Sequence, residues 1–168
     1  MTDPILVAYA TRYGSTEEVA EQVAATLREC GHAVDLKRAR EVRTVEGYGA
    51  VVLGAALYIY RWHRDARRFL SRHRQALADR PVVVFALGPV QDEEEQFQDA
   101  RSQLDKQLAK FPWFTPVAVE MFGGKFDPAK LPFPLNRFAG SEPASDIRDW
   151  EAIRAWANEL PAVLGVGQ

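Results

Sequence analysis

Cysteine is nearly absent from this sequence, because Cys30 is the only one among 168 residues. A lone cysteine excludes an intrachain disulfide and a zinc site built on several thiolates. The three histidines, His32, His63 and His73, are too scattered along the chain to indicate a metal site. We therefore expect a protein of the reducing cytoplasm that binds no metal ion.

The sequence also lacks a long hydrophobic segment and an excess of one charge. Its longest nearly uncharged apolar run, residues 50–60, is too short to cross a bilayer, and Met1–Pro4 has no basic start of a secretory signal. Because 21 lysines and arginines nearly balance 23 acidic residues, we expect no nucleic-acid partner. Peripheral contact with a membrane and the oligomeric state stay open.

Five short apolar runs alternate with longer amphipathic stretches, which is typical of a parallel sheet covered by helices on both faces. Charged residues interrupt the second and fifth runs, as expected at the edges of a sheet, whereas the others read as central strands. The pattern predicts one α/β domain over residues 1–168 with strand order 2-1-3-4-5. The expected strands are residues 5–10, 33–37, 50–56, 81–87 and 117–122.

Four amphipathic stretches carry apolar residues at helical spacing. They predict helices around residues 19–30, 66–77, 97–111 and 150–160. Gly31 is expected to end the first of these in a left-handed conformation, and Pro161 is expected to end the last.

Residues 123–148 contain three glycines and four prolines, which predicts a segment without a long regular element. A connection of this length inside a domain is usually functional or disordered. Because it contains Phe126, Phe133 and Phe138, we interpret it as an ordered insertion that could cover a site.

The first loop of interest follows the first predicted strand and reads Thr11-Arg12-Tyr13-Gly14-Ser15-Thr16. In a doubly wound sheet, ligands bind at the carboxyl ends of the strands where the strand order reverses, here after the first and third strands. Hydroxyl groups, a glycine and the free N–H groups of a helix start suit a phosphate. No lysine follows the glycine, which favours a phosphate monoester over a nucleoside triphosphate. Alternatively, Ser15 or Thr16 only caps the helix.

Two further loops lie at the same edge of the predicted sheet. Residues 57–63 carry aromatic rings that suit stacking on a flat ligand. We expect Trp62 to pack against the neighbouring helix instead, and His63 to point into the site. Residues 87–91 are short enough to hold the other edge of such a ligand through backbone groups.

Together the three loops resemble those of the flavodoxin-like FMN-binding proteins, and the resemblance covers nearly the whole chain. The first loop is similar to the family's T-x-[TY]-G-[NS]-T phosphate loop. Residues 48–58 and 149–157 most resemble the flavodoxin-domain proteins that include the menaquinone-dependent protoporphyrinogen oxidases. The resemblance implies a three-layer flavodoxin-like fold with FMN as cofactor. The residues that it implies are Thr11, Arg12, Tyr13, Gly14, Ser15 and Thr16 around the phosphate, and Ala56, Leu57, Tyr58, Ile59, Tyr60, Leu87, Gly88, Pro89 and Val90 beside the isoalloxazine ring.

Two other classes of protein with this strand order lack their required residues here. A phosphoacceptor receiver domain needs acidic residues at the ends of the first and third strands, where this chain has Ala10-Thr11 and Gly54-Ala55. A low-molecular-weight phosphatase needs a cysteine in the first loop, whereas Cys30 lies at the end of the first predicted helix.

Residues 61–80 contain seven arginines and only two acidic residues. Arg61, Arg64, Arg68 and Arg72 recur at helical spacing and predict a basic stripe beside the ring-binding loop. Such a stripe is either a solvated helix face or a dock for an acidic redox partner or for substrate carboxylates.

The expected function is oxidoreduction with FMN, related to protoporphyrinogen oxidation or to quinone-linked reduction, with a small molecule or a redox protein as electron donor or acceptor. One alternative is a flavodoxin-type electron carrier that acts with redox partner proteins. Another is a domain that keeps the fold but has lost the flavin and serves as an interaction module. Flavodoxin-type carriers resemble one another in having a glycine or another small residue beside the flavin. On one-electron reduction of the flavin, the peptide at this residue turns over, and the turn requires a positive φ. Residues 55–63 contain no glycine, and bulky residues resist that turn, which favours the enzyme. The sequence identifies no catalytic residue.

Overall fold

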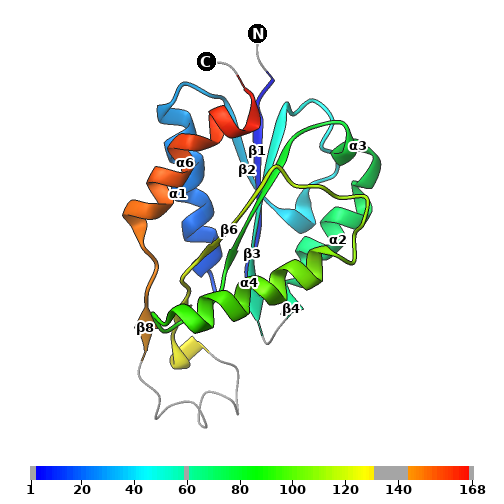
Figure 1. Cartoon of the computed structure of the whole chain (residues 1–168). Coiled ribbons are helices and arrows are strands. Elements are labelled where there is room, and N and C mark those ends of the chain that lie inside the picture. The colour runs from blue at the N-terminus through cyan, green and yellow to red at the C-terminus, as the bar shows by residue number, and fades with distance from the viewer. Residues whose placement is uncertain (1–2, 59–60, 131–143, 167–168) are drawn as a thin grey trace.

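A five-stranded parallel sheet forms the centre of the computed structural model, which describes residues 3–58, 61–130 and 144–166. Its strands are β1 (Ile5–Ala10), β2 (Val34–Arg38), β3 (Ala50–Tyr58), β5 (Val82–Leu87) and β6 (Ala118–Phe122). They are hydrogen-bonded in the order β2-β1-β3-β5-β6 (Figure 1). All five predicted strands and their 2-1-3-4-5 order are therefore confirmed.

Helices cover both faces of this sheet, which makes the fold a three-layer α/β structure (Figure 1). The helices α1 (Ser15–Glu29) and α6 (Trp150–Leu164) cover one face. The other face is covered by α2 (Arg64–Arg72), α3 (Arg74–Ala78) and α4 (Glu94–Leu108), with the short 3-10 helix η1 (Ala39–Glu41). Side chains of a strand alternate between the two faces. Thus Ile5 and Val7 pack under α1 and α6, whereas Leu6 and Ala8 pack on the opposite side.

One predicted helix is broken in two, and another continues past its predicted end. The stretch predicted as one helix over residues 66–77 is two helices, because His73 leaves the helical conformation with φ −106° and ψ 21°. The prediction that Pro161 ends the last helix is wrong: Pro161 lies inside α6, which continues to Leu164. Leu164 is buried in the core. The free energy gained by burying it offsets the loss of the one backbone hydrogen bond that proline cannot donate. Gly31 follows α1 with φ 95°, as predicted.

Gly54 in β3 leaves space for the core aromatic residue Phe85 on β5. A Cβ atom on Gly54 would overlap the Phe85 ring. That ring is fully buried and packs edge-on against Trp156 of α6, with centroids 5.8 Å apart. Gly54 does not have a positive φ. Glycine is therefore required at this position by packing and not by backbone conformation.

The described parts of residues 123–148 contain only short elements, as predicted for this segment. They are β7 (Lys125–Phe126), the 3-10 helix η2 (Pro128–Lys130) and β8 (Ser145–Asp146), with β7 and β8 paired antiparallel. Another short strand, β4 (Arg61–Trp62), pairs with the end of β3. No helix in the described part of the chain is long and apolar enough to cross a membrane.

Candidate functional site

A cavity of about 850 Å³ lies at the carboxyl ends of β1, β3 and β5, where the sequence predicts a ligand site. Three of the predicted residues, Gly14, Thr16 and Pro89, belong to the same loops but do not line the cavity wall. Ile59 and Tyr60 lie outside the described residues. The predicted residues that line the cavity are Thr11, Arg12, Tyr13, Ser15, Ala56, Leu57, Tyr58, Leu87, Gly88 and Val90.

The loop between β1 and α1 presents the start of a helix to this cavity. Gly14 occupies the N-cap position in a left-handed conformation, with φ 92°, and its N–H donates to the Thr11 hydroxyl at 2.9 Å. The alternative that Ser15 or Thr16 caps the helix is therefore wrong, because the cap residue is a glycine without a side chain. The first N–H groups of a helix have no acceptor within the helix. Here no cap side chain takes their place, so they remain available to an anion.

Thr16 provides an independent sign of a ligand in this loop. The residue is fully buried, and its hydroxyl has no hydrogen-bond partner in the described structure. The Tyr13 hydroxyl is likewise buried without a partner. A buried polar group left unpaired costs about 1 to 3 kcal/mol. The Thr16 hydroxyl, in the first turn of a helix whose N–H groups are free, fits a phosphate ester that would accept a hydrogen bond from it.

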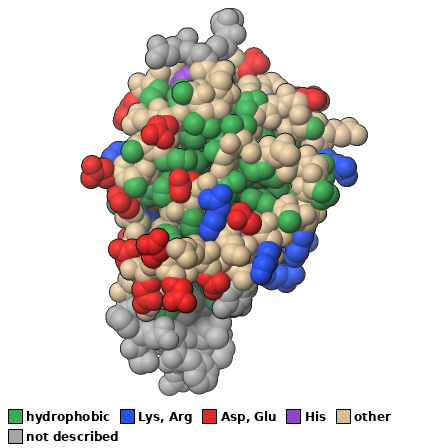
Figure 2. All heavy atoms as spheres, in the orientation of Figure 1, with side chains coloured by type: hydrophobic (Ala, Val, Ile, Leu, Met, Phe, Trp, Pro, Cys, Tyr) green, Lys and Arg blue, Asp and Glu red, His purple; other side chains and the backbone are tan. Residues whose placement is uncertain are grey.

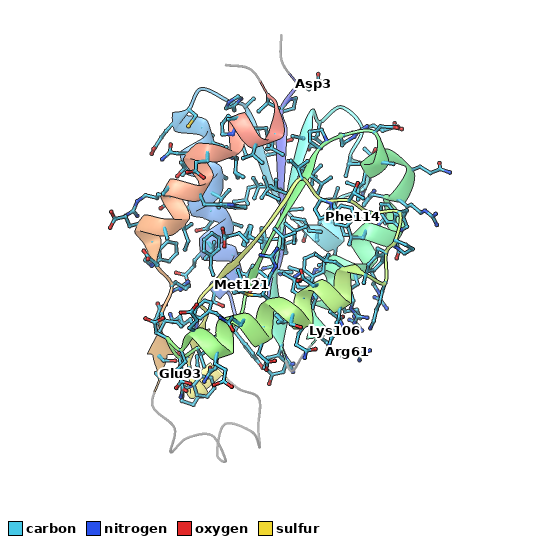
Figure 3. The ribbon with its side chains drawn as sticks, in the orientation of Figure 1. Asp3, Arg61, Glu93, Lys106, Phe114 and Met121 are labelled. Carbon is cyan, nitrogen blue, oxygen red and sulfur yellow. The ribbon has the colours of Figure 1, made fainter. Side chains whose placement is uncertain are left out.

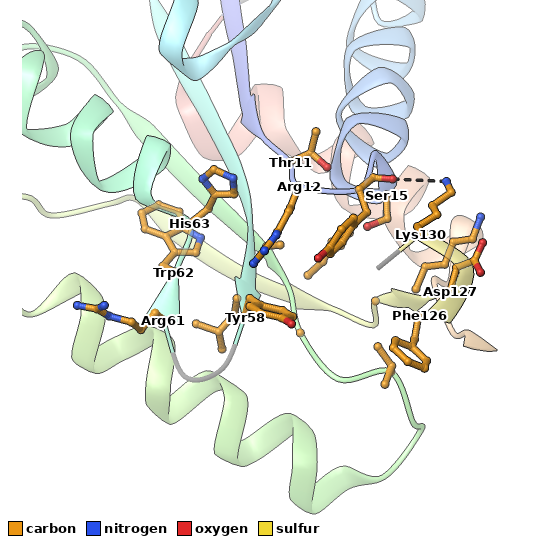
Figure 4. Close-up of a pocket in the computed structure, with 18 of the residues that line it drawn as sticks. Thr11, Arg12, Ser15, Tyr58, Arg61, Trp62, His63, Phe126, Asp127 and Lys130 are labelled. Atoms are coloured by element: carbon orange, nitrogen blue, oxygen red, sulfur yellow. Dashed lines mark hydrogen bonds between the residues drawn. The ribbon is translucent and has the colours of Figure 1, made fainter. Parts of the chain in front are cut away.

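The opposite side of the cavity is formed by β3 and the short strand β4 (Figure 4). Tyr58 is 42% exposed there, and the Arg12 guanidinium lies 5.2 Å from its ring centroid and 5.4 Å from that of Tyr13. Trp62 is almost fully buried, and its indole N–H donates to the carbonyl of Ala55 at 3.3 Å. Trp62 lies in one buried cluster with Ala66 and Phe69 of α2, which confirms the expectation that it packs against the neighbouring helix, and it also lines the cavity.

The third side of the cavity is built from backbone. Gly88 donates its N–H to Phe122 at 3.0 Å, and Gly124 donates to the Pro89 carbonyl at 2.7 Å. A Cβ on Gly124 would lie 2.9 Å from the carbonyl oxygen of Gly88. These two chain segments therefore approach too closely for a side chain, and they hold the loop after β5 in a fixed position.

Residues of β7 and η2 complete the wall near the helix start, although none of them was among the predicted binding residues. Lys125, Phe126, Asp127 and Lys130 line the cavity, and the Lys130 ammonium group lies 3.5 Å from the Tyr13 carbonyl (Figure 4). The insertion was expected to cover a site, but no local pattern singled out these residues.

Positive charge dominates the cavity wall. Asp127 is the one carboxylate among the described lining residues. The sequence predicts a stripe of four arginines on one helix, but Arg61 lies in β4 and not in α2. The prediction is therefore wrong for Arg61. The lining cations are Arg12, Arg61, Arg64, Arg67, Lys125 and Lys130.

His63 lies at the junction of β4 and α2 and lines the cavity, as predicted (Figure 4). Its Nδ1 accepts the Asp65 N–H at 3.0 Å and so caps α2. Burial lowers the pKa of His63, and Arg64 and Arg12 lower that pKa further against the opposing effect of Asp65. With Nδ1 engaged as an acceptor, the proton of the neutral ring is on Nε2, which makes that atom a hydrogen-bond donor.

Arg148 ties the insertion to the start of α1 and was not found from the sequence. Its side chain is only 4% exposed and forms ion pairs with Asp146 at 2.8 Å and Glu18 at 3.1 Å. The same guanidinium donates to the Ser15 carbonyl at 3.2 Å and stacks over Trp150. Arg148 hydrogen bonds lower the pKa of Asp146. A charged side chain therefore holds the start of α1, beside the predicted phosphate loop, through the Ser15 carbonyl.

A model of the flavodoxin domain family matches residues 6–138. The chain belongs to this family. Family membership identifies FMN as the cofactor and oxidation–reduction as the class of reaction. The expected family, fold and cofactor are thereby confirmed.

Individual relatives match nearly the whole chain. Protoporphyrinogen IX dehydrogenase [quinone] from Escherichia coli (strain K12) is 26% identical over 173 residues, which cover 92% of this chain and 93% of the relative. Oxidised flavodoxin 1 from Bacillus cereus has a TM-score of 0.58 and 14% identity, covering 98% of this chain and 99% of that one. The rubredoxin oxygen:oxidoreductase of Desulfovibrio gigas has a TM-score of 0.57 and 16% identity, covering 98% of this chain but only 37% of that one. The latter two similarities show the fold alone.

Proposed function

We propose that this protein is an FMN-dependent dehydrogenase for a largely apolar macrocyclic substrate that carries carboxylates, with a quinone as electron acceptor. The observation that carries this proposal is the position of Arg61, Arg64 and Arg67, which line the same cavity as the phosphate loop. One phosphate monoester does not require so many cations. The relative named protoporphyrinogen IX dehydrogenase supports a tetrapyrrole dicarboxylate as the substrate class and a quinone as the acceptor.

In this proposal the residues of the three loops hold the cofactor. The hydroxyls of Thr11, Ser15 and Thr16 and the N–H groups at the start of α1 bind the phosphate, assisted by the charge of Lys130. Residues 56–58 and 87–90 flank the isoalloxazine ring. When bound, FMN supplies a two-electron acceptor that can pass its electrons to a quinone.

The remaining cavity residues act on the substrate. Arginine binds carboxylate through two parallel hydrogen bonds, so Arg61, Arg64 and Arg67 would orient the acidic edge of the substrate. The Nε2–H group of His63 offers a further donor on the same side. Trp62 and Phe126 provide apolar surface that excludes water from the ring. We further propose that residues 1–168 act as one domain in the cytoplasm, with residues 124–130 forming one wall of the site.

The experiment is an anaerobic assay of the FMN-loaded protein with protoporphyrinogen IX and a soluble quinone, followed by porphyrin fluorescence. We expect quinone-dependent turnover, with a KM that rises about tenfold in an Arg61→Gln/Arg64→Gln variant. The dimethyl ester of the substrate is the matched control, because its turnover should respond little to the same substitutions. Absence of turnover, together with rapid electron exchange with redox proteins, would instead identify an electron carrier.

A further inference from the structure

A second hollow, of about 840 Å³, lies on the outer side of α2, between η1 and the end of α4. We call it the basic groove. Phe69 and Phe111 contribute apolar surface to it, and Asp65 is its one carboxylate among the described residues. Its cations are Arg40, Arg64, Arg67, Arg68, Arg72 and Lys110.

The charges of the basic groove are not neutralised within the protein. In the part of the chain that the structure describes, none of the six cations forms an ion pair with a carboxylate. Six like charges around one hollow repel one another and oppose folding. The protein as a whole has a net charge of −2, so this concentration of positive charge is local. Such an arrangement fits an anionic partner that binds in the groove.

The basic groove adjoins the cavity of about 850 Å³, which we call the flavin cavity on the basis of the proposed function, because Arg64 and Arg67 line both. An occupant that follows α2 would therefore reach the mouth of the cavity.

The shape of the groove and the nature of its rim favour a protein segment over a lipid surface. Binding to a membrane usually adds exposed apolar side chains to the basic ones. The large hydrophobic side chains that are exposed in the described structure are Tyr58, Val117 and Val163, and none of them lines the groove. A flat lipid surface also cannot fill a hollow, whereas an extended chain with acidic side chains can.

The charges on the rest of the surface also favour one orientation of an acidic partner. Figure 2 shows acidic side chains gathered toward the lower left of one face and basic ones toward the lower right. Figure 3 places Glu93 at the start of α4 and Lys106 near its other end. A partner with an acidic face would be repelled at the first end and attracted at the second, which sets its orientation on the protein.

We propose that the basic groove binds an acidic segment of a partner protein, rich in aspartate and glutamate, and directs it along α2 toward the flavin cavity. This inference goes beyond the proposed reaction. It would hold for a dehydrogenase and for an electron carrier, so a failed turnover assay does not decide it.

The test is an NMR titration of the ¹⁵N-labelled, FMN-loaded protein with a short poly-glutamate peptide. We expect chemical-shift changes confined to η1, α2 and the end of α4, and weaker binding at higher salt. An Arg40→Gln/Arg68→Gln/Arg72→Gln variant, which leaves the flavin cavity intact, should bind the peptide about tenfold more weakly or worse. The matched control, Lys37→Gln/Arg43→Gln/Arg154→Gln, removes the same charge from exposed residues outside the groove and should bind as the wild type does.

Three results would overturn the proposal. Equal loss of binding in both variants would show only a response to net charge. Binding to phosphatidylglycerol vesicles that depends on Arg40, Arg68 and Arg72, without binding of the peptide, would make the groove a lipid site. Self-association in sedimentation experiments that the groove variant abolishes would identify the occupant as a second copy of this chain.

Discussion

The guanidinium of Arg148 donates a hydrogen bond to the backbone carbonyl of Ser15 across 3.2 Å, although 133 residues separate the two in sequence. The contact joins the segment after β8 to the first residue of α1. Ser15 lines the flavin cavity, whereas Arg148 does not. Arg148 therefore supports the start of α1 from outside that cavity.

Arg148→Ala should therefore weaken FMN binding as well as the fold. Asp146 and Glu18 are partly exposed and can be hydrated when the arginine is lost, so we expect a loss of about 1 to 3 kcal/mol in the free energy of unfolding. We expect FMN affinity to fall about tenfold because the loop loses its support. Urea unfolding and a fluorescence titration with FMN measure the two effects.

Arg154→Ala is the control for Arg148, since Arg154 is an exposed arginine on α6. If Arg148→Ala lowered stability but left FMN affinity unchanged, its role would be structural only.

Thr16→Val should separate cofactor binding from stability. The Thr16 hydroxyl has no partner in the described structure, so a valine of similar shape removes an unsatisfied group and should leave the cofactor-free protein equally or more stable. FMN affinity should fall about tenfold or more, because the phosphate loses a donor. Thermal unfolding with and without FMN reports both quantities.

Two variants serve as controls for this prediction. Thr16→Ser keeps the hydroxyl and should keep the affinity. Thr26 is also buried, but its hydroxyl accepts a hydrogen bond from Gln22, so Thr26→Val should destabilise the protein without affecting FMN. Unchanged FMN affinity in Thr16→Val would place the phosphate elsewhere.

The sheet could be predicted because each central strand is marked by a continuous apolar run. Residues 82–85 can hardly occupy any position other than a strand buried on both faces. The position of the loop between β1 and α1 at the cavity could be predicted because its hydroxyls and glycine are consecutive in the chain. Its binding of the phosphate stays a prediction.

Lys125, Lys130 and Arg148 escaped prediction for the opposite reason. No spacing connects them to the first loop, and only the return of the chain past the end of the sheet brings them to it. The end of the last helix was wrongly predicted at Pro161, because the rule that proline ends a helix takes no account of the buried Leu164 beyond it.

Gly54→Ala should destabilise the protein through overpacking, since the new methyl group meets the Phe85 ring. We expect a loss of about 1 to 3 kcal/mol in the free energy of unfolding. In the double variant with Phe85→Leu the two effects should be less than additive, because the smaller side chain makes room for the methyl group.

Gly49→Ala provides the comparison for Gly54, as its nearest contact would be the Cβ of Asp3 at 3.3 Å. It should cost clearly less than Gly54→Ala. Strict additivity in the Gly54 and Phe85 cycle would contradict the packing argument.

His63 should make stability depend on pH. Its pKa is lower in the folded protein than the usual value of about 6.5, so the unfolded chain binds more protons below that pH. The stabilisation by neutral His63 is therefore complete above about pH 6.5 and is lost as the pH falls through the lower pKa of the folded protein.

His63→Asn keeps a side chain that can cap α2 but cannot titrate. We expect the wild type to lose more stability than this variant between about pH 8 and pH 5, as measured by urea unfolding. His73 also has a lowered pKa, but it is present in both proteins and cancels from the difference. Parallel pH profiles would show that His63 is not the group responsible.

The backbone beside the proposed ring site should resist the peptide turn that flavodoxin-type carriers use during one-electron reduction. Leu57 and Tyr58 pair with Trp62 and Arg61 across β3 and β4, and His63 donates its N–H to the Ala56 carbonyl at 3.0 Å. A turn to positive φ would disturb this pairing and cost about 1 to 2 kcal/mol more at a bulky residue than at glycine. Reductive titration of the FMN-loaded protein should therefore show little one-electron-reduced flavin in the visible spectrum, and Tyr58→Gly should raise that amount by about tenfold. Nearly complete accumulation of the one-electron form in the wild type would contradict this argument and favour an electron carrier.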